Sequence, residues 1–200
     1  EVAQGAAQGC RHAIYLTLST GIGAGILSDG RLLLGRSGLA TEVGSMMLPL
    51  NDAATRLELE AAGPALARQA RQRLTDGEES LLRKLSDGDL RRVDAALVGQ
   101  AAQQGDPLAL ALVGRAGRLI GLALTSLLHL FNPEIVVIGG GLSQIGEPLL
   151  GPMRDTVRRE VIYEGYTRAL RIELAALGAD VSLVGAAALL RSDPGRGMQD

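Results

Sequence analysis

The chain has 200 residues, of which 46% are hydrophobic and 21% charged, so a folded protein with a substantial core is expected rather than disorder. Lys and Arg number 20 against 22 Asp and Glu, and this balance argues against nucleic-acid binding through a basic surface. One cysteine, Cys10, and two histidines, His12 and His129, exclude an internal disulfide and a Cys-rich zinc site. Aromatic residues make up only 2%, so stacking platforms for single-stranded nucleic acid are not expected.

The N-terminus shows no targeting pattern. Residues 1–9 are small and polar, and the absence of an initiator Met suggests a chain cut from a longer polypeptide. The longest apolar run, Leu119–Phe131, is shorter than the ~20 residues that a membrane span needs. We therefore expect a cytoplasmic protein with no membrane association.

The first predicted elements are three antiparallel strands. Apolar segments at 13–18, 22–27 and 31–34 are separated by Ser19-Thr-Gly21 and by Asp29-Gly30. Asp-Gly between two apolar runs is typical of a type I′ hairpin turn, which requires positive φ at both central residues. A loop interrupted by glycines follows up to Asp52, and its length favours a functional role.

Helices and strands alternate along the rest of the chain. Gly63-Pro64 interrupts the first helical segment, and Asp106-Pro107 is a capping pair that begins the longest one. The order predicts an α/β layered fold in which the strand after the long helix is parallel to its neighbour. The expected helices are Ala53–Leu74, Leu90–Gln103, Leu108–Leu130, Pro148–Val161 and Val181–Leu190, and the expected strands are Glu134–Ile138 and Leu170–Leu174.

Two glycine-rich turns are candidate ligand sites. In Ser19-Thr-Gly-Ile-Gly-Ala-Gly25, the backbone N–H groups and the Thr20 hydroxyl could hold a phosphate, although glycines could also simply relieve crowding in a hairpin. A dinucleotide fingerprint is excluded because a strand follows, not a helix. Gly139-Gly-Gly141 follows a buried strand, where a nucleotide base or ribose could lie on the backbone. The alternative there is an ordinary strand–helix connection.

Two acidic residues are candidates for binding sugar hydroxyls. Glu42 lies in the long loop, and Glu58 lies near the start of the following helix. Carboxylates in a cleft accept hydrogen bonds from hydroxyl groups, whereas most Glu residues are simply solvated. We assign no chemistry to Cys10, His12 or His129.

Taken in order, these segments resemble the ROK family of repressors and sugar kinases. The resemblance covers nearly the whole chain and rests on the order and spacing of its motifs. It implies the C-terminal lobe of an actin-like (ribonuclease H-like) sugar-kinase fold. The segments that carry it are Ser19–Gly25, Asp29–Leu32, Gly38–Gly44, Leu57–Glu58, Gly63–Leu66, Gly105–Ala109, Phe131–Ser143 and Val184–Ala187.

The resemblance also implies a role for each candidate residue. Thr20, Gly21 and Gly23 correspond to the second phosphate loop of the family. Glu42 and Glu58 correspond to its two sugar-binding glutamates. Ser45 stands where family kinases carry a His that contacts sugar and helps to bind zinc, and Gly139, Gly140 and Gly141 correspond to the adenosine-binding glycines.

Four departures from the family pattern change these expectations. Ser19 replaces a glycine and narrows the phosphate turn, and Ser45 replaces the His. Met46–Arg56 contains no Cys, so no zinc is expected. The catalytic Asp and the first phosphate hairpin of the family would precede Glu1, so we expect no catalytic residue in this chain and no phosphorylation by it alone.

The expected organisation is one lobe with a short tail. Residues 1–190 form the ROK C-terminal lobe, with strands at 12–35, a sugar loop at 35–60 and a helical and α/β part at 61–190. Residues 191–200 form a flexible tail, and the N-terminal lobe is absent. The face that would pack on that lobe is exposed unless another chain covers it, so we expect a homodimer or a missing partner segment.

Three functions remain open. The first is a lobe of a sugar kinase whose intact form uses ATP and Mg²⁺ to phosphorylate a hexose or hexosamine. The second is the effector domain of a sugar-responsive repressor, with DNA contacted only through a missing N-terminal region. The third is a degenerate fold kept as an oligomerisation module.

Overall fold

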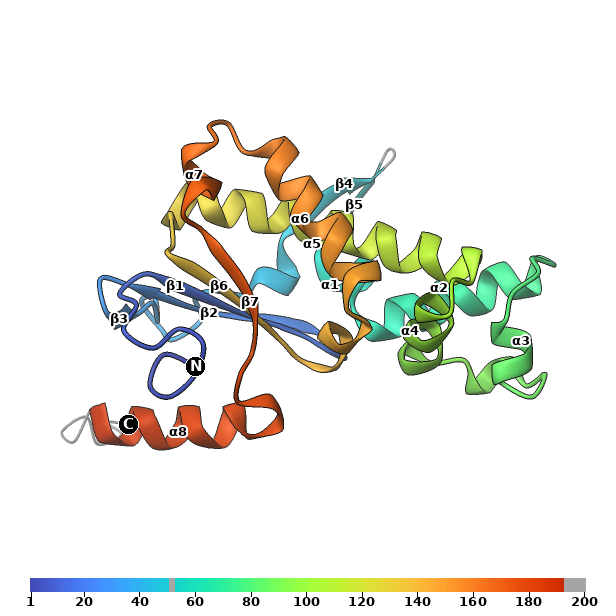
Figure 1. Ribbon diagram of the computed structural model, residues 1–200, viewed down its shortest axis with the longest axis horizontal. Coiled ribbons are helices and arrows are strands. Elements are labelled where there is room, and N and C mark those ends of the chain that lie inside the picture. The colour runs from blue at the N-terminus through green and yellow to red at the C-terminus, as the bar shows by residue number, and fades with distance from the viewer. Residues whose placement is uncertain (51–52, 193–200) are drawn as a thin grey trace.

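The computed structural model describes residues 1–50 and 53–192 (Figure 1). Its centre is a five-stranded sheet with the strand order β3-β2-β1-β6-β7, and the core helices lie against one face of it. A separate hairpin, β4-β5, extends away from this sheet. The strands are β1 (Ala13–Leu18), β2 (Ile22–Ser28), β3 (Arg31–Leu32), β4 (Met47–Leu50), β5 (Ala53–Arg56), β6 (Ile135–Gly139) and β7 (Arg171–Leu174).

The helices divide into core helices and short connecting ones. The long helices α5 and α6 cover the sheet, and α2 to α4 form an extension beyond its edge (Figure 1). The α-helices are α1 (Leu57–Ala61), α2 (Gly63–Thr75), α3 (Leu82–Leu85), α4 (Ala95–Gln103), α5 (Pro107–Phe131), α6 (Glu147–Glu160), α7 (Gly165–Arg168) and α8 (Val181–Ser192). Four 3-10 turns join them: η1 (Val43–Ser45), η2 (Leu90–Arg92), η3 (Gly141–Ile145) and η4 (Gly178–Asp180).

The sheet confirms the predicted strand directions. β1 is antiparallel to β2 and parallel to β6, so the strand that follows the long helix is parallel to its neighbour, as expected. All five residues of β6 are buried, as a β-branched central strand requires. Asp29 and Gly30 have φ values of 52° and 74°, which agree with the predicted type I′ turn.

Helix α5 forms the middle of the core. The Asp106 carboxylate accepts a hydrogen bond of 2.8 Å from the N–H of Ala109, and Pro107 begins the first turn. Gly117 and Gly121 let α6 approach closely: a Cβ at Gly121 would lie 2.7 Å from the Met153 carbonyl oxygen. By length and composition α5 could span a membrane, but 72% of its most apolar window is buried inside the protein, as in the core helix of a globular fold.

One predicted helix boundary is wrong. Ala53–Arg56, expected to begin a helix, forms strand β5 and pairs with β4, a hairpin that the sequence analysis did not predict. The N–H of Leu57 still donates to the Met46 carbonyl at 2.9 Å, so the helix cannot begin before this pairing ends. Ala53–Arg56 is a strand because it pairs with the neighbouring segment Met47–Leu50, and its own four residues show no alternating apolar pattern.

The second helical segment also begins later than expected. Asp94 caps α4 by accepting a hydrogen bond of 2.8 Å from the N–H of Leu97, so Leu90–Arg92 forms only a 3-10 turn. The short helices α3 and α7 were not predicted. Helix α8 continues to Ser192, two residues into the predicted flexible tail, and 193–200 lie outside the described residues.

Candidate functional site

A pocket of about 510 Å³ opens at the carboxyl-terminal edge of β1 and β6. Its walls come from the turn after β1, the N-terminal ends of α2 and α4, and the turn η3 after β6. The structure therefore brings the two glycine-rich turns of the sequence to one cavity. The lining residues are Ser19, Thr20, Gly63, Pro64, Ala67, Asp94, Ala95, Ala96, Gly99, Gln100, Gln103, Gly141, Leu142, Gln144 and Ile145.

The parallel pairing of β1 and β6 explains why these turns meet. Thr17 is the register partner of Gly139, so the chain leaves both strands at the same edge of the sheet. Ligands in open α/β sheets bind at this edge. The N–H of Gly63 also donates to the Ser19 carbonyl at 2.8 Å, which attaches the start of α2 to the turn.

The turn after β1 has features of an anion site. The N–H of Ser19 donates to the Gly21 carbonyl at 2.9 Å and closes the turn. Within the described part of the chain, the backbone N–H groups of Thr20 and Gly21 have no hydrogen-bond acceptor, and Thr20 is exposed at the pocket. Gly23 lies within β2, where a Cβ would lie 3.1 Å from Cγ2 of Thr17, and it is not a lining residue.

The three glycines after β6 differ in their surroundings. A Cβ at Gly139 would overlap the Tyr15 hydroxyl, and one at Gly140 would overlap the Leu18 carbonyl. Burial raises the pKa of Tyr15, so this phenol stays protonated at neutral pH. Gly141 is exposed, and a Cβ placed on it would meet no described atom within 4 Å. Packing thus accounts for Gly139 and Gly140, and Gly141 is the one that faces the pocket.

Side-chain contacts hold the far wall of the pocket together. Nε2 of Gln103 donates to the carbonyls of Gln144 at 2.9 Å and of Ile145 at 3.2 Å. A Cβ at Gly99 would lie 2.8 Å from Cγ1 of Ile145, so only glycine allows η3 this close to α4. The geometry of the cavity therefore depends on the contact between α4 and η3.

The charge of the lining comes from one side chain. Asp94 is the sole acidic residue among the described lining residues, which include no Lys or Arg. The N-terminus of α2 also lies at the pocket and supplies partial positive charge that favours an anion, whereas the Asp94 carboxylate, which caps α4, offsets the positive end of that helix. The sequence analysis did not select Asp94 or the glutamines, although the Gly63-Pro64 break and the capping position of Asp94 are signals for helix starts.

Of the two candidate glutamates, Glu58 lies beside the turn after β1, and Glu42 belongs to a segment that Glu58 also borders. A Cβ placed on Gly21 would lie 3.3 Å from Oε2 of Glu58, and one placed on Gly44 would lie 3.1 Å from it. Glu58 on α1 therefore borders both the turn after β1 and the segment that carries Glu42. Glu42 is exposed at the start of η1, two residues from Gly44.

The loop that carries Glu42 is held on the sheet. The Thr41 hydroxyl donates to the Ala24 carbonyl at 2.8 Å, and a Cβ on Gly44 would overlap the Ile22 carbonyl. Ser45 is exposed, and its N–H donates to the Glu42 carbonyl at 3.1 Å. In residues 1–50 and 53–192, no three His, Cys, Asp or Glu side chains gather as metal ligands would.

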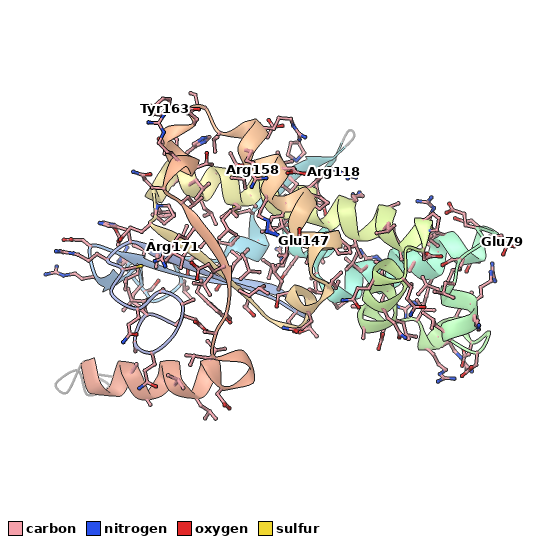
Figure 2. The ribbon with its side chains drawn as sticks, in the orientation of Figure 1. Glu79, Arg118, Glu147, Arg158, Tyr163 and Arg171 are labelled. Carbon is pink, nitrogen blue, oxygen red and sulfur yellow. The ribbon has the colours of Figure 1, made fainter. Side chains whose placement is uncertain are left out.

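The histidines and the cysteine lie elsewhere and act as packing and hydrogen-bonding groups. Nε2 of His129 accepts from the N–H of Ile162 at 3.2 Å, and Nδ1 of His12 accepts from the N–H of Asp29 at 3.3 Å. Cys10 is buried and accepts from Nη2 of Arg171 on β7 at 2.9 Å, and neither residue lines the pocket (Figure 2 labels Arg171).

Comparison with solved structures first defines the class. A ROK family glucokinase from Streptomyces griseus, solved in complex with glucose and AMPPNP, matches with a TM-score of 0.82 and 35% identity over 94% of this chain and 62% of its own. A ROK family transcriptional regulator, a homologue of the E. coli MLC protein, matches with a TM-score of 0.85 and 28% identity over 96% of this chain and 48% of its own. The fold is therefore that of the ROK sugar kinases and regulators.

The sequence comparisons lead to the family itself. A glucokinase from Thermotoga maritima is 36% identical over 193 residues, which cover 94% of this chain and 60% of the relative. The model of the ROK family matches residues 1–193, and the chain belongs to this family. The chain spans about 60% of the length of the curated glucokinases that it matches.

Proposed function

We propose that this chain is the lobe of a ROK sugar kinase that binds the sugar and carries a nucleotide site. In the intact protein, the γ-phosphoryl group of ATP would pass to a hexose or hexosamine. The observation that carries the proposal is the position of the turn at Thr20 and Gly21. Thr20 lines the 510 Å³ pocket, and Gly21 beside it lies next to the Glu58 carboxylate, whose Oε2 is 3.3 Å from where a Cβ on Gly21 would be.

The nucleotide would lie in the pocket with its phosphates at the turn after β1. The free N–H groups of Thr20 and Gly21 and the Thr20 hydroxyl would donate to phosphate oxygens, and the N-terminus of α2 would favour the negative charge. The adenosine would lie against Gly141 and the wall between α4 and η3. Gly139 and Gly140 would act indirectly, by keeping β6 and β1 close enough to shape this wall.

The residues present fit a magnesium ion that arrives with the nucleotide. Mg²⁺ is usually held by one or two carboxylates together with substrate phosphates, and Asp94, Ser19 and Thr20 offer oxygen ligands in the lining. Because no basic side chain lines the pocket, the ion would also supply the positive charge that a triphosphate needs.

The sugar would bind beside the same turn. Glu42 and Glu58 would accept hydrogen bonds from its hydroxyls. Ser45 would offer a hydroxyl group on a shorter side chain than the His that family kinases carry at this position. Gly23 would not contact the ligands; it would leave room for the Thr17 side chain opposite it, where β1 and β2 pair next to the turn. In this arrangement, the acceptor hydroxyl of the sugar lies next to the phosphates.

The intact protein would supply what this lobe lacks. We propose that residues 1–190 are the C-terminal lobe, that the general base lies outside this chain, and that the protein is a cytoplasmic homodimer.

A second candidate is the effector domain of a sugar-responsive repressor. The likeness to the MLC homologue, at a TM-score of 0.85, favours it, and so does Ser45, because a sensor does not need the catalytic and metal-binding parts of a kinase. Such a protein would bind sugar through Glu42 and Glu58 but would not need ATP.

Calorimetry on this chain separates the candidates. Glucose, N-acetylglucosamine and MgAMPPNP are titrated separately into the wild type and into Glu58→Gln. The kinase proposal predicts that the wild type binds the nucleotide and one of the sugars, and that Glu58→Gln loses only sugar binding. Sugar binding without nucleotide binding would favour the repressor, and binding of neither would overturn both in favour of an oligomerisation module.

A further inference from the structure

Helix α1, which carries Glu58, is too short to be stable alone. It has five residues, whereas isolated helices shorter than about 12 residues are marginal in water. Leu57 and Ala61 are buried and attach one side of it to the core. The direction of the Glu58 side chain must therefore be set by further contacts between α1 and its neighbours.

Glu60 makes a polar contact with the core helix α5. Its Oε2 accepts a hydrogen bond of 2.8 Å from Nη2 of Arg115, and its Oε1 lies 3.4 Å from the Thr55 hydroxyl, which donates to it. The Glu60 side chain is 22% exposed and that of Arg115 36%, so water screens this ion pair less than a surface pair. One carboxylate thus connects α1 to both α5 and β5.

Glu58 and Glu60 lie on different sides of α1. Residues two apart on a helix do not face each other, because each residue advances the helix by about 100°. Oε2 of Glu58 lies beside Gly21 and Gly44, whereas Glu60 contacts α5. The ion pair therefore holds the helix on the side away from the proposed sugar.

Helix α2 completes the attachment through the backbone. Nε2 of Gln69 donates to the Glu60 carbonyl at 3.2 Å, and Nη2 of Arg68 donates to the Leu59 carbonyl at 2.6 Å. These bonds satisfy carbonyls at the end of α1 that have no partner within so short a helix. They limit sliding of α1, and the Glu60–Arg115 pair limits its rotation.

Arg115 has little alternative to this pairing. Among the described residues, Glu60 is the acidic residue that forms an ion pair with this guanidinium. The other terminal nitrogen, Nη1, is buried and has no hydrogen-bond partner among them. A partly buried charge that loses its partner is costly. Removal of Glu60 should therefore disturb α5 and α1 together.

We infer that Glu60 and Arg115 are positioning residues, which orient α1 so that the Glu58 carboxylate faces the sugar. This inference rests on the proposed function, since it gives the pair a role in sugar affinity. It predicts that the pair affects sugar binding more than nucleotide binding, because the pocket lining does not include α1.

The test compares Arg115→Met, Glu60→Gln and the double variant with a matched control. Arg154→Met removes the ion pair with Glu147 on α6, which does not involve α1 (Figure 2 labels Glu147). Hydrogen exchange of residues 57–62 measures how firmly α1 is held. Calorimetry with glucose or N-acetylglucosamine and with MgAMPPNP measures the two affinities.

We expect faster exchange of residues 57–62 and about two- to tenfold weaker sugar binding in Arg115→Met, with nucleotide affinity as in Arg154→Met. The double variant should be no worse than the single variants, and Arg115→Lys, which keeps the charge, should restore part of the sugar affinity. The inference would be overturned if residues 57–62 exchanged hydrogen in Arg115→Met as slowly as in the Arg154→Met control. It would also be overturned if these residues exchanged faster but the sugar affinity of Arg115→Met stayed unchanged. A wild type that binds neither sugar contradicts the proposed function, and in that case the exchange rates alone decide whether the pair holds α1.

Discussion

Gly44 and Glu58 lie next to each other, although one belongs to a 3-10 turn on the sheet and the other to helix α1. A Cβ on Gly44 would lie 3.1 Å from Oε2 of Glu58 and would overlap the Ile22 carbonyl. The absence of a side chain at Gly44 thus lets η1, which begins just after Glu42, rest on β2 beside Glu58. In the proposed sugar site, this close approach would set the relative position of the two glutamates.

Substitution of Gly44 should therefore separate the two glutamates. We expect Gly44→Ala to lose about 1–3 kcal/mol of stability through overpacking and to weaken sugar binding at least tenfold. Gly25→Ala is the matched control, because a Cβ there meets no described atom within 4 Å. Thermal unfolding and calorimetry with glucose or N-acetylglucosamine measure both effects. Equal behaviour of the two variants would show that the approach at Gly44 is not required.

The glutamates themselves should contribute to sugar affinity and not to stability. Glu42 is exposed and Glu58 half-buried, so replacement by Gln leaves no buried charge unpaired. A hydrogen bond to a charged group contributes about 1.5–3 kcal/mol, so each change to Gln should weaken sugar binding about 10- to 100-fold. Calorimetry should show this at unchanged MgAMPPNP affinity. An exposed carboxylate distant from the turn, Glu79→Gln, is the control, and a loss as large in this variant would contradict specific roles for Glu42 and Glu58 (Figure 2).

The nucleotide pocket should depend on the contact between α4 and η3. Gln103→Ala removes both hydrogen bonds to the carbonyls of Gln144 and Ile145, and we expect about three- to tenfold weaker MgAMPPNP binding as this wall loosens. Gln104→Ala changes the neighbouring, exposed glutamine and should leave affinity unchanged. If Gln103→Ala binds the nucleotide as the wild type does, η3 is held in place by packing at Gly99 alone.

Acid stability should depend in part on Glu134. Its Oε1 accepts from the N–H groups of His12 at 2.9 Å and Arg11 at 2.8 Å, and these two bonds, that of His12 first, lower the pKa of Glu134 below its ordinary value of 4.5. A carboxyl group whose pKa is lower in the folded state stabilises the fold above its unfolded pKa and loses this effect as the pH falls through the folded pKa.

Glu134→Gln should therefore reduce stability at pH 6, and the difference should shrink as the pH falls below 4.5 and through the folded-state pKa of Glu134. Urea unfolding of both proteins at a series of pH values from 6 downwards measures the difference. A gap between wild type and variant that stays constant over the whole range would show that the charge of Glu134 does not contribute.

Much of the fold could be predicted from local sequence. Asp106-Pro107 marks the start of α5, Asp29-Gly30 gives the type I′ turn, and the β-branched run of β6 is a buried central strand, as expected. The strand Ala53–Arg56 could not be predicted, because its stability comes from pairing with Met47–Leu50 and not from its own pattern.

The candidate site shows the same limit. The order of strands along the chain could suggest that the two glycine turns lie at the same edge of the sheet. It could not show which of the three glycines after β6 faces the pocket, because Gly139 and Gly140 are required by their packing against Tyr15 and Leu18. Asp94 carries no signal beyond that of a helix cap, because its place in the pocket depends on how α4 packs against η3.

Backbone NMR of this chain tests the central claim most directly, because the turn at Thr20 and Gly21 should respond to two ligands. With MgAMPPNP, we predict amide shifts at Thr20, Gly21, Gly99 and Gly141. With glucose or N-acetylglucosamine, we predict shifts at Gly44 and Glu58, and again at Gly21. A turn that responds to neither ligand, or sugar-induced shifts that avoid both Gly44 and Glu58, would contradict the account.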